Sequence, residues 1–313
     1  MKQKVGFLFI VGFYGKDIPD WLKGFSQEFG LGGVIIYNRN FNNIDNLSGL
    51  ILRIKNELSP LLICVDQEGG KKRRLDFEPY DAPFDMAKKF GLGGIYDVYK
   101  VSARRLARLG FNVNFAPVCD IAENGSYIGK RAFGCDAFEV ANAVRASVYG
   151  IKAGGIIPVA KHFPGLGRSK TDPHMDLPEL ELSIEQLLKW ELIPFKEAIS
   201  AGARFIMTTH VVLKQLENMP VTFSNIAINF LRSSLKHDGI VLTDDILMGA
   251  LKGYSLEDRI RLSLTAGHDM VLISNGDERL FDIVCRLENN LIADKIWRVY
   301  MLKKEVMDGE KRS

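Results

Sequence analysis

Charged and imidazole side chains follow several short apolar runs of this sequence, at the points where the runs end. These residues are Asp66, Asp120, the pair Lys161 and His162, His210, and the pair Asp244 and Asp245. A single aspartate after a strand often caps the next helix. We assign that role to Asp245, because Asp244 already takes the strand end. Helix capping does not explain the whole set, so the pattern predicts a polar site built at strand ends.

A second group of such residues stands in the long segment from Lys161 to His174, which ends Asp172-Pro173-His174. Proline restricts the residue before it to extended conformations, so the Asp172 carboxylate is able to reach the His174 ring. A carboxylate partner fixes the imidazole tautomer and raises its basicity, which suits proton transfer near neutral pH. Short Asp-x-His strings are common, and a solvated loop without a function is an equal alternative on spacing alone.

The elements that must position these groups alternate regularly along the chain. Eight short apolar runs fit strands buried on both faces, as in a parallel sheet: residues 5–11, 33–37, 61–65, 113–118, 156–160, 205–208, 240–242 and 270–273. Helical periodicity fills the intervals, and the stretches 183–199, 224–235 and 255–266 each open with a serine suited to an N-cap. This alternation predicts an α/β protein with a (β/α)8 TIM barrel fold. A doubly wound open sheet is the alternative.

In such a barrel the loops that follow the strands all emerge at one face, where active sites form. The third of these loops (residues 66–83) and the fifth (residues 161–182) are long. No composition shift marks a linker. We therefore expect one catalytic barrel domain over residues 1–313, with a basic helical tail from Lys295 onward.

Composition excludes several classes of protein. The 313 residues carry 41 Lys and Arg against 38 Asp and Glu, a net charge of +3, with 47% apolar residues. These proportions are those of an ordinary soluble protein. A charge so close to neutral argues against nucleic acid as a partner. No apolar run reaches the roughly 18 residues of a membrane span.

The cysteines and the N-terminus bear on compartment and cofactors. The four cysteines, Cys64, Cys119, Cys135 and Cys285, form no CxxC pair, so we expect neither a disulfide scaffold nor a metal site, and no cofactor. Residues 1–13 resemble a short signal peptide, but no small-x-small cleavage site follows. A first buried strand is the better interpretation, and we expect a cytoplasmic protein with reduced thiols.

Six segments, in order and with suitable spacing, carry a family resemblance: residues 32–40, 66–70, 130–134, 161–165 together with 172–174, 243–248 and 266–273. Between about residues 5 and 275 the chain resembles glycoside hydrolase family 3, and in particular its bacterial β-N-acetylhexosaminidases of peptidoglycan recycling. The resemblance implies a single (β/α)8 barrel that acts on a small carbohydrate.

The resemblance also implies roles for individual residues. Asp244 matches the catalytic nucleophile, and His174 matches the general acid/base, oriented by Asp172. The residues that match those hydrogen-bonding the sugar hydroxyls are Asp66, Arg131, Lys161 and His162. His210 resembles a polar residue that borders the same pocket.

These residue types suit a retaining glycosidase. Such an enzyme needs a carboxylate that attacks the anomeric carbon, and a second group that protonates the leaving oxygen and then activates water. Imidazole, with an unperturbed pKa of roughly 6.5, can take the second role. Together with these residue types, the resemblance implies a retaining exo-β-N-acetylglucosaminidase that acts on muropeptides, and we expect a monomer.

Part of the chain departs from the family pattern. Residues 165–169 read Gly-Leu-Gly-Arg-Ser, whereas the family loop usually reads Gly-His-Gly-Asp-Thr, and Pro173 stands where serine is usual. One hypothesis is that Arg168 attracts an anionic leaving group such as a muramic acid derivative. A solvated arginine without that role is the alternative.

Three other functions stay open from the sequence. Phosphate in place of water as the acceptor would make a glycoside phosphorylase. A β-glucosidase would use the same residues on a different sugar. The altered loop at residues 165–169 also fits a catalytically inactive sugar-binding protein.

Overall fold

Eight parallel strands close into a barrel in the computed structural model, which describes residues 2–76 and 80–310. The barrel strands are β1 (Phe9–Val11), β2 (Gly33–Ile36), β3 (Leu62–Val65), β6 (Val113–Asn114), β7 (Ile157–Phe163), β9 (Phe205–Thr208), β11 (Ile240–Asp245) and β12 (Met270–Ile273). They follow one another around the barrel in chain order, and β1 pairs with both β2 and β12. This closure confirms the predicted (β/α)8 barrel and excludes the open sheet.

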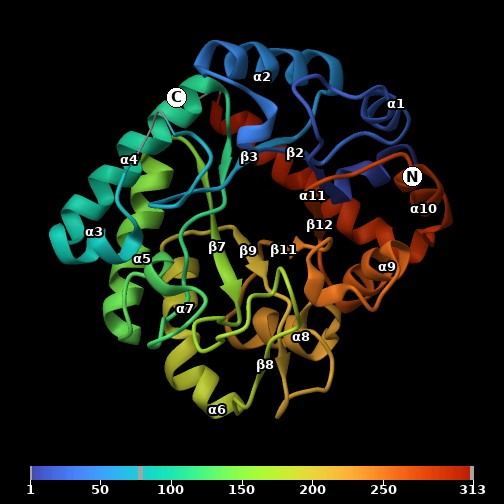
Figure 1. The fold of residues 1–313 in the computed structure, drawn as a ribbon. Coiled ribbons are helices and arrows are strands. Elements are labelled where there is room, and N and C mark those ends of the chain that lie inside the picture. The colour runs from blue at the N-terminus through green and yellow to red at the C-terminus, as the bar shows by residue number, and fades with distance from the viewer. Residues whose placement is uncertain (1, 77–79, 311–313) are drawn as a thin grey trace.

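A ring of helices surrounds the strands (Figure 1). The helices are α1 (Asp20–Phe29), α2 (Ile44–Leu58), α3 (Pro83–Lys89), α4 (Leu92–Leu109), α5 (Ala137–Ala153), α6 (Ile184–Gln186), α7 (Ile193–Ser200), α8 (Asn225–Ser234), α9 (Leu256–Ala266), α10 (Arg279–Arg286) and α11 (Asn289–Glu310). The three serines expected as N-caps do cap helices: Ser183, Ser224 and Ser255 each accept a backbone hydrogen bond from the residue three positions on.

Burial explains why these segments take these forms. All residues of β1, β2, β3, β9 and β12 are buried. Strands covered on both faces read as continuous apolar runs, as here. In α2, by contrast, the buried residues recur at helical spacing: Leu47, Leu50, Ile51, Ile54 and Leu58. The packed layer between strands and helices holds the strand ends, and hence the site, in place.

The first apolar run differs from the expectation. Only Phe9–Val11 of residues 5–11 is strand, and the preceding part belongs to a 3-10 helix, η1 (Lys2–Leu8). The chain passes very close to its neighbour here, since a Cβ on Gly6 would lie 1.9 Å from the carbonyl oxygen of Gly30. A short apolar run does not by itself distinguish a buried strand from a buried helical turn.

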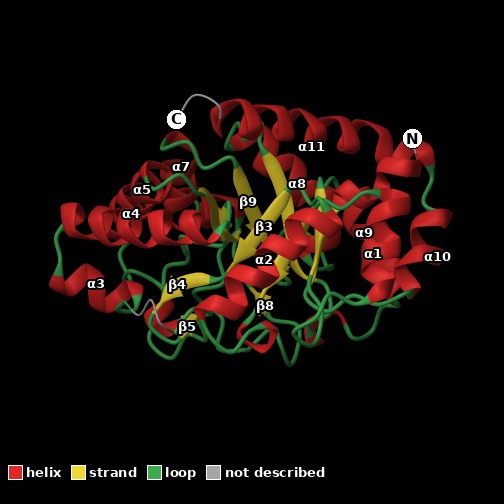
Figure 2. Cartoon of the chain, turned by 90° about the horizontal axis from the view of Figure 1, so that it is seen from above, coloured by secondary structure: helices red, strands yellow, loops and turns green. Residues whose placement is uncertain are grey.

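The two ends of the barrel carry different structures (Figure 2). One end carries α11, which begins before the expected Lys295 and buries Ile292, Ile296, Val299 and Leu302. Residues 311–313 of the expected tail lie outside the described residues. The other end carries the hairpin of β4 (Gln67–Gly69) and β5 (Lys72–Arg73), and the pair β8 (Glu179–Leu180) and β10 (Val212–Leu213). This is the end at which the strands' carboxyl termini emerge.

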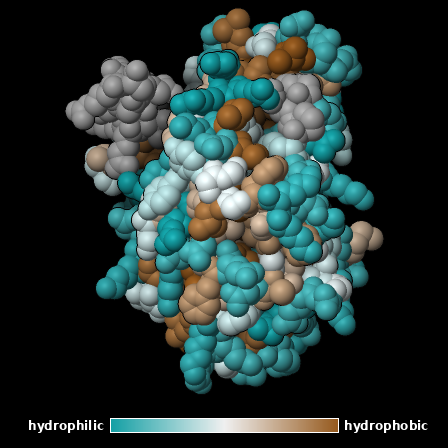
Figure 3. All heavy atoms as spheres, turned by 90° about the vertical axis from the view of Figure 1, so that its left-hand side faces the viewer, coloured by the Kyte–Doolittle hydropathy of each residue, from teal (hydrophilic) through white to brown (hydrophobic). Residues whose placement is uncertain are grey.

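The outer surface is largely hydrophilic on the face shown in Figure 3, with hydrophobic side chains scattered among polar ones. The exposed apolar residues include Phe138 at 62% and Leu92 at 46%. Within the described part of the chain, no helix has both the length and the apolar character that crossing a bilayer requires.

Candidate active site

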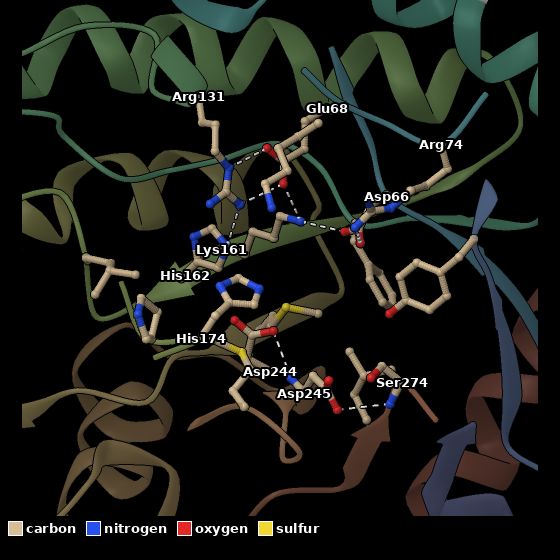
Figure 4. A pocket seen from close by; sticks show the side chains of 18 of the residues that line it. Asp66, Glu68, Arg74, Arg131, Lys161, His162, His174, Asp244, Asp245 and Ser274 are labelled. Atoms are coloured by element: carbon tan, nitrogen blue, oxygen red, sulfur yellow. Dashed lines mark hydrogen bonds and ion pairs between the residues drawn. The ribbon is translucent and has the colours of Figure 1, made fainter. Parts of the chain in front are cut away.

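A polar cavity of about 190 Å³ opens at the carboxyl ends of the barrel strands (Figure 4). Seven of the eight expected site residues are brought together by the fold. Six line the cavity: Asp66, Arg131, Lys161, His162, His174 and Asp244. Asp172 lies beside His174. Further lining residues that the sequence did not indicate include Tyr37, Glu68, Arg74 and Tyr127.

Irregular strand pairing aims the central residues into the cavity. The register of β7 against β9 shifts between Ala160 and Phe163, so Lys161 and His162 lie within a bulge. The register of β11 against β12 likewise shifts between Leu242 and Asp245, which encloses Asp244. Neighbouring residues of a regular strand point to opposite faces, and a bulge re-aims them. This is why both Lys161 and His162 line the cavity.

Two carboxylates and three cations form a cluster along one wall. Lys161 Nζ lies 2.8 Å from Asp66 Oδ1 and 2.6 Å from Glu68 Oε1. Arg131 donates two hydrogen bonds to Glu68, at 2.8 and 2.9 Å. Arg74 donates to the other Asp66 oxygen at 3.1 Å. These charged groups are nearly buried, so the pairing offsets the cost of removing them from water.

The cluster keeps both carboxylates ionised. Burial raises the pKa of Asp66, but the charges of Lys161 and Arg74 outweigh burial and hold the pKa at about 2. Burial also raises the pKa of Glu68, and Arg131 and Lys161 outweigh it, so the pKa lies well below the usual value. Asp66 and Glu68 are two residues apart on an extended segment, which puts both on one side. That spacing is the signal by which Glu68 could have been found.

His162 is fixed from both sides of its ring. Nδ1 lies 2.6 Å from the buried Asp120 carboxylate, and Nε2 lies 3.0 Å from Arg131 Nη2. A guanidinium only donates, so Nε2 accepts and the ring hydrogen sits on Nδ1, facing Asp120. Asp120, which also accepts the backbone N–H of Leu166 at 2.6 Å, therefore supports the cavity wall rather than lining it.

Asp172 and His174 form a hydrogen-bonded pair at the opening of the cavity. Asp172 Oδ1 accepts from the His174 backbone N–H and from Nδ1, both at 2.8 Å. The hydroxyl of Tyr127 lies 3.0 Å from the same Nδ1. Burial raises the pKa of Asp172, but hydrogen bonds from His174, and a smaller one from Tyr127, outweigh it and lower the pKa. The pair therefore has the geometry of an oriented imidazole.

Asp244 presents a carboxylate from the end of β11, and Figure 4 shows it on the His174 side of the cavity, across from the cluster. Asp245 does not begin a helix as expected. Its carboxylate accepts the backbone N–H groups of Leu247 at 3.2 Å and Ser274 at 2.9 Å, which ties β11 to the end of β12. Burial raises the pKa of Asp245.

His210 lies behind the wall of the cavity, against Asp245, which lines it. It is fully buried, and it is not among the residues that line the cavity. Its Nδ1 lies 2.6 Å from the Thr222 hydroxyl, and its Nε2 lies 2.9 Å from the carbonyl oxygen of Asp245. Both ring nitrogens are thus used within the protein. His210 supports the end of β11 from behind, and burial lowers the pKa of its ring.

Arg168 is paired within the protein. It lies 2.6 Å from both Glu191 Oε1 and Glu123 Oε1, and it does not line the cavity. The hypothesis that Arg168 attracts an anionic leaving group is therefore not supported, and the arginine fastens its own loop. Leu166, the other departure, is buried and contributes to the cavity wall.

The described residues contain no group of three or more His, Cys, Asp or Glu that could hold a metal ion. The cysteines are free thiols. The ionisable groups that line the cavity are carboxylates, imidazoles, ammonium and guanidinium groups, and phenols.

A (β/α)8 barrel with a carboxylate, an imidazole–carboxylate pair and a cation–carboxylate cluster around one cavity has the groups of a glycoside hydrolase. The family model described as the glycosyl hydrolase family 3 N terminal domain matches residues 2–302. The chain belongs to glycoside hydrolase family 3, and it is a glycoside hydrolase.

Named relatives agree with this assignment. A β-hexosaminidase of Methylococcus capsulatus is 33% identical over 266 residues, which cover 82% of this chain and 80% of the relative. The structure of a family 3 β-N-acetylglucosaminidase from a Paenibacillus species superposes with a TM-score of 0.90 at 32% identity over 98% of this chain. The chain spans only 62% of that protein's length. NagZ from Neisseria gonorrhoeae, solved in complex with N-trifluoroacetyl-D-glucosamine, gives a TM-score of 0.81 at 29% identity, over 93% of this chain and 89% of NagZ.

Proposed function

We propose that the protein is a retaining exo-β-N-acetylglucosaminidase. The observation that carries the proposal is the arrangement around one cavity of the Asp244 carboxylate, the Asp172–His174 pair and the cluster of Asp66. The names of the relatives support N-acetylhexosamine as the sugar.

The reaction follows from these groups in two steps. Asp244 attacks the anomeric carbon and forms a glycosyl ester, while the protonated His174 gives its proton to the leaving oxygen. His174, now neutral, takes a proton from water, and the oxygen of that water displaces Asp244 from the anomeric carbon. Two inversions give net retention. Asp172 orients the imidazole and stabilises its charged form.

The opposite wall suits the hydroxyl groups of a terminal sugar. Asp66 accepts from hydroxyl groups, whereas Arg131 and Lys161 donate to their oxygens. His162 is held by Asp120 and Arg131 at the edge of the same wall. Because Glu68 fixes both Arg131 and Lys161, these donors are positioned before the sugar arrives, which lowers the ordering cost of binding.

The biological source of the sugar and the setting are parts of the same proposal. The likeness to β-hexosaminidases and to NagZ supports muropeptide fragments as substrates. We place the activity in the cytoplasm, in peptidoglycan recycling. One copy of the chain supplies every proposed group, so a monomer is sufficient.

Hydrolysis of p-nitrophenyl β-N-acetylglucosaminide tests the proposal. Asp244→Ala should lower kcat/KM by roughly 1,000-fold or more, because the attacking group is gone. NMR should show the β-anomer as the first product, also in phosphate buffer, where a phosphorylase would release a sugar 1-phosphate.

A matched control lies on the same strand. Asp238 is exposed just before β11, at the end of the strand away from the cavity, and Asp238→Asn should leave kcat/KM within about twofold of the parent. Turnover by Asp244→Ala at the parental rate would refute the role of Asp244. A folded parent that binds the sugar without hydrolysing it would refute the enzyme assignment.

A further inference from the structure

A second, larger cavity adjoins the first. Its volume is about 970 Å³, and three residues line both cavities: Lys72, Tyr127 and Arg131. Its lining is partly apolar, from Tyr80, Phe90, Val98 and Ile128. Two carboxylates also line it, and both are paired: Asp81 with Lys89 and Asp85 with Lys130. The passage between the two cavities is therefore bounded by two cations and a tyrosine, with apolar surface beyond.

Lys72 differs from the cations around it. Arg131, Arg74, Arg73 and Lys130 are each paired with a carboxylate, namely Glu68, Asp66, Asp76 and Asp85. No described residue accepts a hydrogen bond or forms an ion pair with the ammonium group of Lys72. The side chain is nevertheless half-buried. Burial, with the nearby charge of Arg131, lowers its pKa. A partly desolvated ammonium without an acceptor costs free energy that a bound anion would recover.

The position of Tyr127 indicates which part of a substrate meets Lys72. The Tyr127 hydroxyl lies 3.0 Å from Nδ1 of His174, the group that we propose protonates the leaving oxygen. Tyr127 and His174 line the same cavity with their ring centroids 6.2 Å apart, so a leaving group bound beside the His174 ring lies near Tyr127. The second cavity begins at the same tyrosine.

We propose that the junction of the two cavities is a binding site for a carboxylate carried by the leaving group, with Lys72 as its ammonium partner. The inference rests on the proposed glycosidase function and adds a specificity to it. The apolar lining beyond Lys72 accommodates the carbon skeleton to which the carboxylate is attached. The sequence analysis considered Arg168 as the cation that attracts an anionic leaving group, but Arg168 is paired with Glu123 and Glu191.

A pair of substrates that differ in one charge provides the test. N-acetylglucosaminyl-β-1,4-N-acetylmuramic acid carries a carboxylate on its leaving sugar, and its methyl ester does not. For the parent enzyme, kcat/KM should favour the acid. Lys72→Met should lower the acid-to-ester ratio of kcat/KM by roughly tenfold, as expected for the loss of one charge-assisted contact. Lys72→Arg should retain most of the preference.

Controls separate this inference from the proposed function. Lys196→Met removes one positive charge from an exposed site on α7 and should not change the ratio. If Lys72→Met leaves the ratio unchanged while the parent hydrolyses both substrates, the carboxylate site is refuted and the glycosidase proposal stands. A second pair, p-nitrophenyl N-acetylglucosaminide with and without a 6-phosphate, carries its anion on the other sugar. If Lys72→Met lowers the preference for the anionic member of this pair alone, the anion binds with the other sugar and the carboxylate site is refuted. If neither disaccharide is hydrolysed but p-nitrophenyl β-N-acetylglucosaminide is, the carboxylate site is refuted and the glycosidase proposal stands. If none of the three substrates is hydrolysed, both proposals fall.

Discussion

Two polar groups lie within hydrogen-bond distance of one ring nitrogen at the cavity opening. Nδ1 of His174 carries at most one hydrogen, yet it lies 2.8 Å from Asp172 and 3.0 Å from the Tyr127 hydroxyl. A carboxylate is the stronger acceptor, so that hydrogen points to Asp172. Burial, assisted by the carboxylates of Asp172 and Asp244, raises the pKa of Tyr127 to about 12. The phenol therefore stays protonated and is a donor to the Asp172 carboxylate.

Tyr127→Phe tests whether this hydroxyl positions the acid/base. The loss should be several-fold in kcat/KM for glycosides with poor leaving groups, which depend on proton donation. It should be much smaller for 2,4-dinitrophenyl N-acetylglucosaminide, whose leaving group departs without a proton. The measurement is the slope of log kcat/KM against leaving-group pKa, which should become steeper.

Tyr149→Phe is the matched control, because Tyr149 is 48% exposed on α5. That variant should leave the slope unchanged. An equal loss across all leaving groups in Tyr127→Phe would show that the hydroxyl merely supports the loop, and would contradict the positioning role.

At the scale of elements, the segment β4 is what organises the sugar-binding wall. The segment β4 begins directly after Asp66, at the end of β3. It brings Glu68 into contact with Lys161 from β7 and with Arg131 from η3 (Gly129–Arg131). The Glu68 side chain is only 2% exposed. Glu68 thus pairs with both cations, as the carboxylate partner of Arg131 and, with Asp66, as one of two partners of Lys161.

Glu68→Gln should therefore damage binding and stability together. Arg131 would lose its carboxylate partner and Lys161 one of its two, which should cost on the order of 3 kcal/mol of unfolding free energy, measured by urea denaturation. Because Arg131 and Lys161 would be displaced as hydrogen-bond donors to the sugar, kcat/KM should also fall by roughly 100-fold, chiefly through a higher KM. Glu139→Gln, at an exposed position on α5, should change neither quantity. A Glu68→Gln enzyme with parental KM would contradict the role of β4.

Much of this wall could be predicted from the sequence, and the reasons for the remainder are physical. Asp66, Lys161 and Asp244 were found because buried strands end in polar residues at one face of a barrel. The bulges that aim Lys161 and His162 together depend on the register of the neighbouring strand, which no local pattern records.

The other differences between the sequence prediction and the structure depend on partner residues that are distant in the sequence. Arg168 and Glu191 are 23 positions apart, and only the folded chain shows that they pair. His210 follows a strand as His162 does, but Thr222 and the Asp245 carbonyl occupy both of its nitrogens. A polar residue at a strand end therefore either lines the cavity or supports its wall from behind. Its hydrogen-bond partners in the folded chain determine which of the two it does.

At the scale of the whole molecule, the barrel also buries histidines away from the cavity. His268 is fully buried, with Nδ1 3.0 Å from the Ser263 carbonyl oxygen and Nε2 2.9 Å from the Thr208 hydroxyl. Burial lowers the pKa of His268 to about 3 and that of His237 to about 4. Below about pH 6.5 the unfolded chain binds protons at these residues and the folded chain does not, so stability falls as the pH falls.

Asp66 contributes to the same decline over a lower range of pH. Its folded pKa is about 2 against a usual value of 3.8, so its stabilising effect is complete above pH 3.8 and is lost as the pH falls toward 2. Two pH windows result. Histidines dominate the loss of stability between pH 6.5 and about 4, and paired carboxylates add to it below that range.

Urea unfolding measured from pH 7 to pH 2.5 separates the two windows. His268→Gln should reduce the slope of unfolding free energy against pH by about 1.4 kcal/mol per pH unit between pH 6 and 4, because one proton uptake by the unfolded chain is removed. Asp66→Asn should flatten only the part below pH 4. The comparison uses slopes, so a general loss of stability in either variant does not obscure it. If His268→Gln leaves the slope above pH 4 unchanged, the His268 ring takes up its proton as readily in the folded chain as in the unfolded one. Its buried contacts with Ser263 and Thr208 would then not exclude the charged form.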